Sequence, residues 1–171
     1  MTTATDVLAD GYGRVREAVH DVVDGLDTDA LAYRPDPEAN SIAWLVWHLS
    51  RVQDDHVAEV AGTEQRWTAG GWVHRFSLPF DPAATGYGQR PDEVGAVRVG
   101  AELLAGYHDA VHGATADYLG HLEEAELERV VDRRWDPPVT LAVRLVSVLA
   151  DDLQHVGQAA YLRGMLERRR R

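Results

Sequence analysis

The sequence contains no cysteine among its 171 residues. This absence excludes disulfide bonds, thiolate metal ligands and a sulfur nucleophile supplied by the protein itself. Any thiol chemistry must therefore use a thiol that arrives as a substrate. Lysine is also absent, since all 17 basic residues are arginine, and this composition is typical of a GC-rich genome.

The sequence also lacks an apolar run close to the ~20 residues that span a bilayer, so we expect no membrane segment. Residues 1–10 lack the basic start and apolar stretch of a secretory signal, which makes a cytoplasmic protein the default expectation. The formal net charge of -11 would repel a phosphate backbone and disfavours nucleic acid as a partner. The basic run at 168–171 is expected to be a solvated tail. A chain of this length predicts one domain, 1–171.

Apolar residues recur at three- and four-residue intervals in four segments, which is the period of an amphipathic helix. The predicted helices cover residues 5–26, 42–61, 101–122 and 141–166. The segment 27–40 contains two prolines and is predicted to be non-helical. No segment has a credible strand pattern, so the sequence predicts an all-α fold, a four-helix bundle.

A long loop, residues 62–99, is predicted between the second and third helices. It holds several glycines and prolines and no sustained helical period, although residues 91–97 could add a short helical turn. Long ordered loops in compact domains are usually lids or binding segments. We expect this loop either to contact a substrate or to pack over an end of the bundle. Its aromatic residues are Trp67, Trp72, Phe76, Phe80 and Tyr87.

Three side chains form a candidate metal site. Asp151 and His155 are four residues apart in the predicted last helix, so both project from one face and could chelate a cation or simply hydrogen-bond each other. Asp152 competes with Asp151 for this role. His48 lies among apolar neighbours in the second helix, where it is either a hydrogen-bonded core residue or a ligand. Because bundles build metal sites from inward side chains on different helices, we predict that His48, Asp151 and His155 bind one metal.

Two imidazoles and one carboxylate leave coordination positions open, which is typical of a catalytic site. Zinc is the first choice, and nickel, iron or manganese would accept the same ligands. Asp55 lies two turns beyond His48 on the same helix face, where it is either a base, an outer partner of the ligands or a solvated surface charge. Arg144 and Gln158 lie in line with His155, and Gln158 is predicted to hydrogen-bond a ligand or another helix.

Two stretches of the chain resemble the DinB superfamily: N-S-I-A-W-L-V-W-H-L at 40–49 and D-D-L-Q-H-V-G-Q-A-A-Y-L-R-G at 151–164. The resemblance spans almost the whole chain. It implies a four-helix bundle with long loops, in which one metal ligand comes from the second helix and two, spaced by four, from the last. His48, Asp151 and His155 occupy those positions. Many members carry histidine at all three, whereas Asp151 resembles the branch with an acidic ligand, which includes mycothiol-dependent maleylpyruvate isomerase.

The resemblance further implies a divalent metal and, in several branches, activation of a low-molecular-weight thiol such as mycothiol, bacillithiol or glutathione. The arginine-rich composition fits an actinobacterial host, in which mycothiol would be the thiol. Metal coordination favours the thiolate, which would attack an electrophile held under the aromatic loop. Arg144 or Arg163 would pair with carboxylates of the thiol or the substrate. We therefore expect a cytoplasmic thiol S-transferase acting in detoxification, and a homodimer is compatible because related bundles often pair.

Two other functions fit the same residues. One is a metal-dependent hydrolase or isomerase that uses hydroxide in place of a thiolate. The other is a non-catalytic, stress-related protein in which a metal is absent or only stabilises the bundle. Product analysis separates the first from a transferase, and metal content tests the second.

Overall fold

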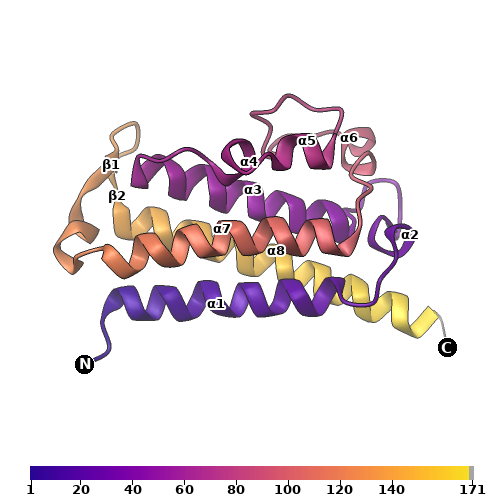
Figure 1. The fold of residues 1–171 in the computed structure, drawn as a ribbon, viewed down its shortest axis with the longest axis horizontal. Coiled ribbons are helices and arrows are strands. Elements are labelled where there is room, and N and C mark those ends of the chain that lie inside the picture. The colour runs from indigo at the N-terminus through magenta and orange to yellow at the C-terminus, as the bar shows by residue number, and fades with distance from the viewer. Residues whose placement is uncertain (170–171) are drawn as a thin grey trace.

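The computed structural model describes residues 1–169, so the last two arginines of the basic run at 168–171 lie outside the described residues. Four long helices lie side by side (Figure 1), with their bounds at α1 Ala4–Val23, α3 Ile42–Ala61, α7 Ala101–His121 and α8 Leu141–Arg169. Helices α1 and α8 run in one direction, and α3 and α7 run in the opposite one (Figure 1). The all-α prediction is confirmed.

Each helix of the bundle packs mainly against two others. Helix α3 contacts α7 and α8, and α1 contacts the same two helices. The ends of the helices are set by local chemistry. The Thr3 hydroxyl accepts a hydrogen bond from the Asp6 backbone N–H at the start of α1, and the Ser41 hydroxyl accepts one from Trp44 at the start of α3. Gly62 ends α3 with a φ of 68°, the left-handed conformation that favours glycine.

The links between the long helices contain more regular structure than the sequence predicted. A short helix, α2 Thr28–Leu31, precedes the prolines of the segment expected to be non-helical, and α1 ends at Val23 instead of residue 26. Before α8 the chain forms a 3-10 turn, η1 Glu124–Glu128, and a two-stranded antiparallel hairpin. Its strands are β1 Val130–Asp132 and β2 Val139–Thr140. Elements of two to five residues are too short to show a period.

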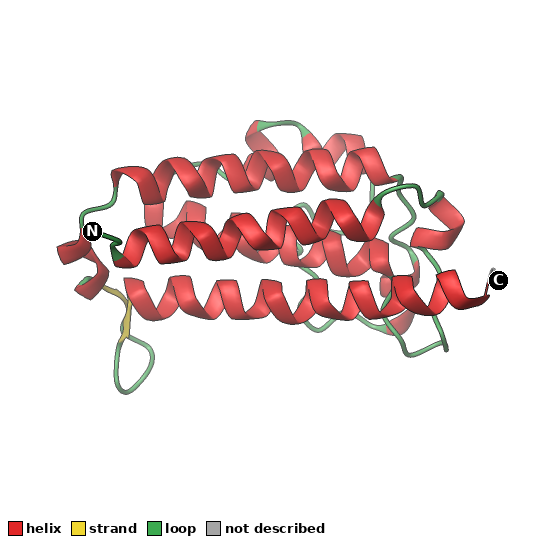
Figure 2. Cartoon of the chain, turned by 90° about the horizontal axis from the view of Figure 1, so that it is seen from below, coloured by secondary structure: helices red, strands yellow, loops and turns green. Residues whose placement is uncertain are grey.

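The segment 62–99 is folded down over the outer side of α3 (Figures 1 and 2). It contains α4 Arg66–Ala69, α5 Trp72–Phe76 and α6 Pro91–Gly95. The turn expected at 91–97 is therefore confirmed, whereas α4 and α5 were not predicted. Most of its aromatic side chains are buried in the core, but Tyr87 is 95% exposed. Because this segment covers α3, nearly the whole of that helix is buried.

Within residues 1–169, no helix is both long enough and apolar enough to cross a membrane.

Candidate metal centre

The three predicted ligands meet between α3 and α8. One ligand atom from each of His48, Asp151 and His155 lies within 4.8 Å of the other two. The imidazole centroids of His48 and His155 are 4.8 Å apart, and His155 Nε2 lies 3.5 Å from Asp151 Oδ1. His48 is buried, whereas the side chains of Asp151 and His155 are 38% and 18% exposed. The exposed parts of Asp151 and His155 leave this site open to solvent on one side.

Hydrogen bonds orient both imidazoles. His48 Nδ1 lies 2.6 Å from the Thr85 carbonyl oxygen and donates to it. His155 Nδ1 lies 3.2 Å from Gln158 Oε1. In His48 the Nδ1–H is used by the Thr85 carbonyl, so the lone pair of Nε2 is left for a metal. In His155, Nδ1 faces the Gln158 oxygen and Nε2 faces Asp151. Histidines that bind a metal through one ring nitrogen commonly hydrogen-bond an oxygen atom through the other.

The loop around residue 86 holds His48 from the other side. Gly86 has a φ of 99°, and a Cβ there would come within 2.6 Å of His48 Nδ1. The indole of Trp44 stacks on the His48 ring at 4.6 Å with an interplanar angle of 13°. Its N–H donates to Gln89 Oε1 at 2.7 Å. The imidazole therefore lies between an aromatic plane and a closely approaching backbone, with little freedom to rotate.

A buried charge network anchors this loop. The Asp54 carboxylate accepts hydrogen bonds from the backbone N–H groups of Arg66 and Trp67, at 2.8 and 2.7 Å, and from the Tyr107 hydroxyl at 2.9 Å. The fully buried guanidinium of Arg51 lies 3.8 Å from the same carboxylate. It donates to the carbonyl of Ala84. Since Ala84 precedes Thr85, this network fixes the carbonyl that orients His48.

The pKa values of all three side chains of the triad are shifted by their surroundings. The hydrogen bond from His155, against the opposing effect of burial, lowers the pKa of Asp151. The same contact raises the pKa of His155. Burial lowers the pKa of His48, which keeps this ring neutral. A neutral His48 and an ionised Asp151 are the forms that bind a divalent cation, and the raised pKa of His155 makes metal binding compete with protonation of this ring.

Asp55 and Arg144 lie away from the three ligand atoms, in a polar cleft of about 380 Å³ that also contains His56, Glu59 and Arg134. Asp55 accepts a hydrogen bond from Gln65 at 2.7 Å. Arg144 is nearly buried and donates to Glu59 at 2.5 Å, with Asp132 3.6 Å away. The cleft lies about two helical turns from the triad, since Asp55 follows His48 by seven residues in α3 and Arg144 precedes Asp151 by seven in α8. The roles predicted for Asp55 and Arg144 stay predictions.

Gln158 contacts the triad directly through His155, whereas Arg163 does not belong to it. The Arg163 guanidinium donates to the backbone carbonyls of Asp21 and Asp24, at 2.6 and 2.7 Å. These contacts join α8 to the end of α1. The role predicted for Arg163 in thiol binding stays a prediction. Asp152, the competitor of Asp151, is fully buried in the bundle and does not belong to the metal-binding group.

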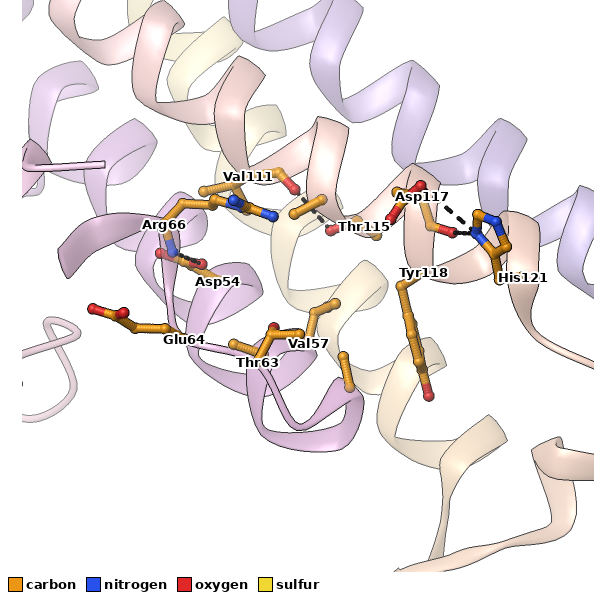
Figure 3. Close-up of a pocket in the computed structure, with 13 residues that line it drawn as sticks. Asp54, Val57, Thr63, Glu64, Arg66, Val111, Thr115, Asp117, Tyr118 and His121 are labelled. Atoms are coloured by element: carbon orange, nitrogen blue, oxygen red, sulfur yellow. Dashed lines mark hydrogen bonds and ion pairs between the residues drawn. The ribbon is translucent and has the colours of Figure 1, made fainter. Parts of the chain in front are cut away.

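His108 and His112 also lie outside the triad. His108 is fully buried with its Nδ1 3.0 Å from the Ser50 hydroxyl. A separate cavity of about 220 Å³ lies between α3 and α7 (Figure 3), where Asp54, Tyr118 and His121 are among its lining residues. None of the predicted site residues lines it.

Sequence reasoning missed the groups that hold His48. The Thr85 acceptor is a backbone carbonyl, which carries no residue-specific signal. Trp44 lies one turn before His48 and was interpreted only as an apolar neighbour. Gly86, within the sequence G-Y-G, was a local indication, since glycine allows the backbone to approach a neighbouring group closely.

The helices and the three converging donors define an all-α bundle protein with a two-histidine, one-carboxylate donor set. A family model described as mycothiol-S-transferase matches residues 8–168. The chain belongs to this family. It is also similar to a solved structure, described as a conserved protein from Enterococcus faecalis. That similarity has a TM-score of 0.89 and 29% identity, and covers 95% of this chain and 96% of the other. A search of curated proteins gave no significant match.

Proposed function

We propose that this protein is a divalent-metal-dependent transferase that conjugates mycothiol to an electrophile. The observation that carries the proposal is the convergence of His48, Asp151 and His155, with both Nδ1 atoms beside oxygen acceptors and His155 Nε2 turned toward Asp151. Membership of the mycothiol S-transferase family supports the thiol. The absence of cysteine supports it too, because the reacting sulfur must come from a small molecule.

The three side chains fit a divalent cation, and zinc is the first candidate. When bound, such a cation would lower the pKa of a coordinating thiol, so that the thiolate dominates near neutral pH. His48 and His155 would hold it through Nε2, and Asp151 would supply one negative charge. Thr85 and Gln158 keep the rings oriented. Trp44 shields His48 from water, while the partly exposed side of Asp151 and His155 admits the substrates.

The polar cleft beside the triad fits the sugar and polyol head of mycothiol. Residues Arg144 and Asp151 are seven apart in α8, about 10 Å along the helix, which suits a head linked to a sulfur at the metal. Arg144 already has Glu59 and Asp132 as charge partners. We therefore propose that Arg144 donates hydrogen bonds to hydroxyl groups of the thiol, and that Asp55 accepts hydrogen bonds from them. Pairing with a carboxylate suits Arg144 less, because mycothiol has no free carboxylate.

The test combines metal content with product analysis. Protein stripped with a chelator and reloaded with zinc or nickel should bind one metal per chain. With mycothiol and monochlorobimane, it should then form the bimane conjugate, detected by fluorescence and mass spectrometry. His155→Ala should lose both the metal and the conjugation. His121→Ala is the control, because its side chain is 82% exposed and lies outside the triad.

Three results would contradict the proposal: far less than one metal per chain after reloading, conjugation that persists in His155→Ala, or halide release without a conjugate, which would indicate hydrolysis. Action in cytoplasmic detoxification and a homodimeric state also belong to the proposal. Sedimentation of the purified protein checks the second of these.

A further inference from the structure

An apolar cleft of about 610 Å³ runs along α8 on the side of the triad opposite the polar cleft. Its apolar lining comes mainly from Leu45 of α3 and from Leu153, Gly157, Tyr161 and Leu162 of α8. Leu153 and Tyr161 are open to solvent, with 47% and 68% of their surface exposed, whereas Leu45 and Leu162 are buried beneath them. Large apolar groups left exposed beside one another often mark a binding surface.

This cleft reaches the edge of the metal centre. Gln158 lines the cleft and also contacts His155 Nδ1 at 3.2 Å. Gln154, another lining residue, lies between Asp151 and Gln158 in sequence and follows Asp151 by three residues, about one helical turn. On the facing helix, Leu45 precedes His48 by one turn. A molecule in the cleft would thus extend to the partly exposed side of the triad.

The two clefts beside the triad have opposite chemistry. Five charged or titratable side chains line the polar cleft, namely Asp55, His56, Glu59, Arg134 and Arg144. In contrast, no Asp, Glu, Arg or His is among the described residues that line the apolar cleft. An ionised substrate would lose hydration in the apolar cleft without gaining a charged partner, which disfavours it. An uncharged hydrophobic group would gain from burial there.

We propose that the apolar cleft holds the hydrophobic body of the electrophile, so that the enzyme prefers uncharged aromatic or alkyl electrophiles to small polar ones. This inference rests on the proposed function. With monochlorobimane as electrophile, the thiol loses its proton to solvent and its sulfur attacks the chloromethyl carbon. The new S–C bond forms as the C–Cl bond breaks, and chloride leaves with the bonding electrons. The bimane rings would pack against the apolar side chains that line the cleft.

Gly157 offers a test that fills the cleft without disturbing the fold. A Cβ at this position meets no atom within 4 Å, so Gly157→Leu places its side chain in open space within the cleft. Leucine is also a better helix former than glycine. Gly113→Leu is the matched control, because Gly113 is an exposed α7 glycine with the same open surroundings and lines neither cleft.

Two electrophiles that both react at a chloromethyl carbon distinguish binding in the apolar cleft from the chemical step. Monochlorobimane is bicyclic and hydrophobic, whereas chloroacetamide is small and polar. Gly157→Leu should lower the ratio of kcat/KM for monochlorobimane to that for chloroacetamide by about tenfold or more, within the range known for hydrophobic pockets. Metal content should stay at one per chain, and Gly113→Leu should keep the wild-type ratio. An unchanged ratio in a metal-loaded Gly157→Leu protein would overturn the inference.

A binding measurement separates this inference from the proposed function. The unreactive dimethyl bimane, which lacks chlorine, should bind the wild-type protein and Gly113→Leu, and should bind Gly157→Leu about tenfold more weakly or worse. If wild-type protein forms no conjugate but shows this binding pattern, the proposed reaction fails and the ligand class of the cleft stands. If neither variant affects bimane binding, the proposal that the apolar cleft binds the electrophile is wrong, whether or not the protein forms the conjugate.

A second copy of this chain is the competing occupant, since the exposed apolar residues of α8 also include Val143 and Val146. Sedimentation of the same variants distinguishes the two. A loss of dimer in Gly157→Leu, with bimane binding unchanged, would show that the cleft is a subunit interface and would overturn the inference. An oligomeric state equal to that of wild type, with weakened bimane binding, supports it.

Discussion

Gly86 is the position where the fold and the metal centre are most directly coupled. An alanine Cβ at residue 86 would lie 2.6 Å from His48 Nδ1, and 3.1 and 3.2 Å from the rings of Trp47 and Trp44. It would thus contact the nitrogen that donates to the Thr85 carbonyl at 2.6 Å. The loop must move or the imidazole must turn. Either response weakens the hydrogen bond that presents Nε2 to the metal.

The magnitude follows from two separate effects. An L-residue at a φ of 99° costs about 1–2 kcal/mol of folding free energy. Loss of an outer hydrogen bond to a metal-binding histidine costs roughly 10–100-fold in metal affinity, or about 1.4–2.7 kcal/mol. We therefore expect Gly86→Ala to lower both the free energy of unfolding of the metal-free protein and the affinity for zinc.

Gly88→Ala is the matched control for Gly86→Ala. Gly88 lies in the same loop with a φ of 71°, but a Cβ there meets no atom within 4 Å. It should cost a similar backbone strain and leave the zinc Kd close to the wild-type value. Urea denaturation measures the stability, and competition with a chromophoric chelator measures the Kd. If folded Gly86→Ala binds zinc as tightly as Gly88→Ala, the Thr85 hydrogen bond does not support the site and our reasoning is wrong.

Three further perturbations have expected outcomes. Burial lowers the pKa of His108 to about 3, so the unfolded chain binds a proton below about 6.5 that the folded chain does not. Stability should therefore fall from that pH downward by up to roughly 1.4 kcal/mol per pH unit, and His108→Gln should remove this part of the slope in urea titrations. Asp54→Ala leaves the buried N–H of Trp67 and the partly buried N–H of Arg66 without acceptors, and the Arg51 guanidinium without its counter-charge. This substitution should lower the free energy of unfolding by roughly 3 kcal/mol or more. Asp117→Ala, at an exposed position, should change it little in the same urea assay. Because Asp151 raises the pKa of His155, zinc affinity should fall as pH drops through that raised value, by up to roughly tenfold per unit. Zinc titrations of Asp151→Asn should show the onset at lower pH, and an onset that does not move would contradict the coupling.

The all-α fold could be predicted from the sequence because apolar residues in the four long segments follow one helical period. The pairing of Asp151 with His155 could be predicted for a similar reason, since residues four apart in a helix share a face whatever surrounds them. Both conclusions depend on backbone geometry within one element. His48 was joined to this pair because bundles build metal sites from inward side chains on different helices, and the resemblance to a known family implied the same three ligands.

Only the tertiary structure decided what surrounds that site. The carbonyl that orients His48 belongs to Thr85, 37 residues away in sequence, and it is held there by the buried Arg51 and Asp54. Helix α4, too short for a visible period, carries part of that support through the N–H groups of Arg66 and Trp67. The polar and apolar clefts likewise combine residues from different helices, the hairpin and the loops. Contacts between distant segments depend on how the helices pack, and no local pattern in the chain encodes them.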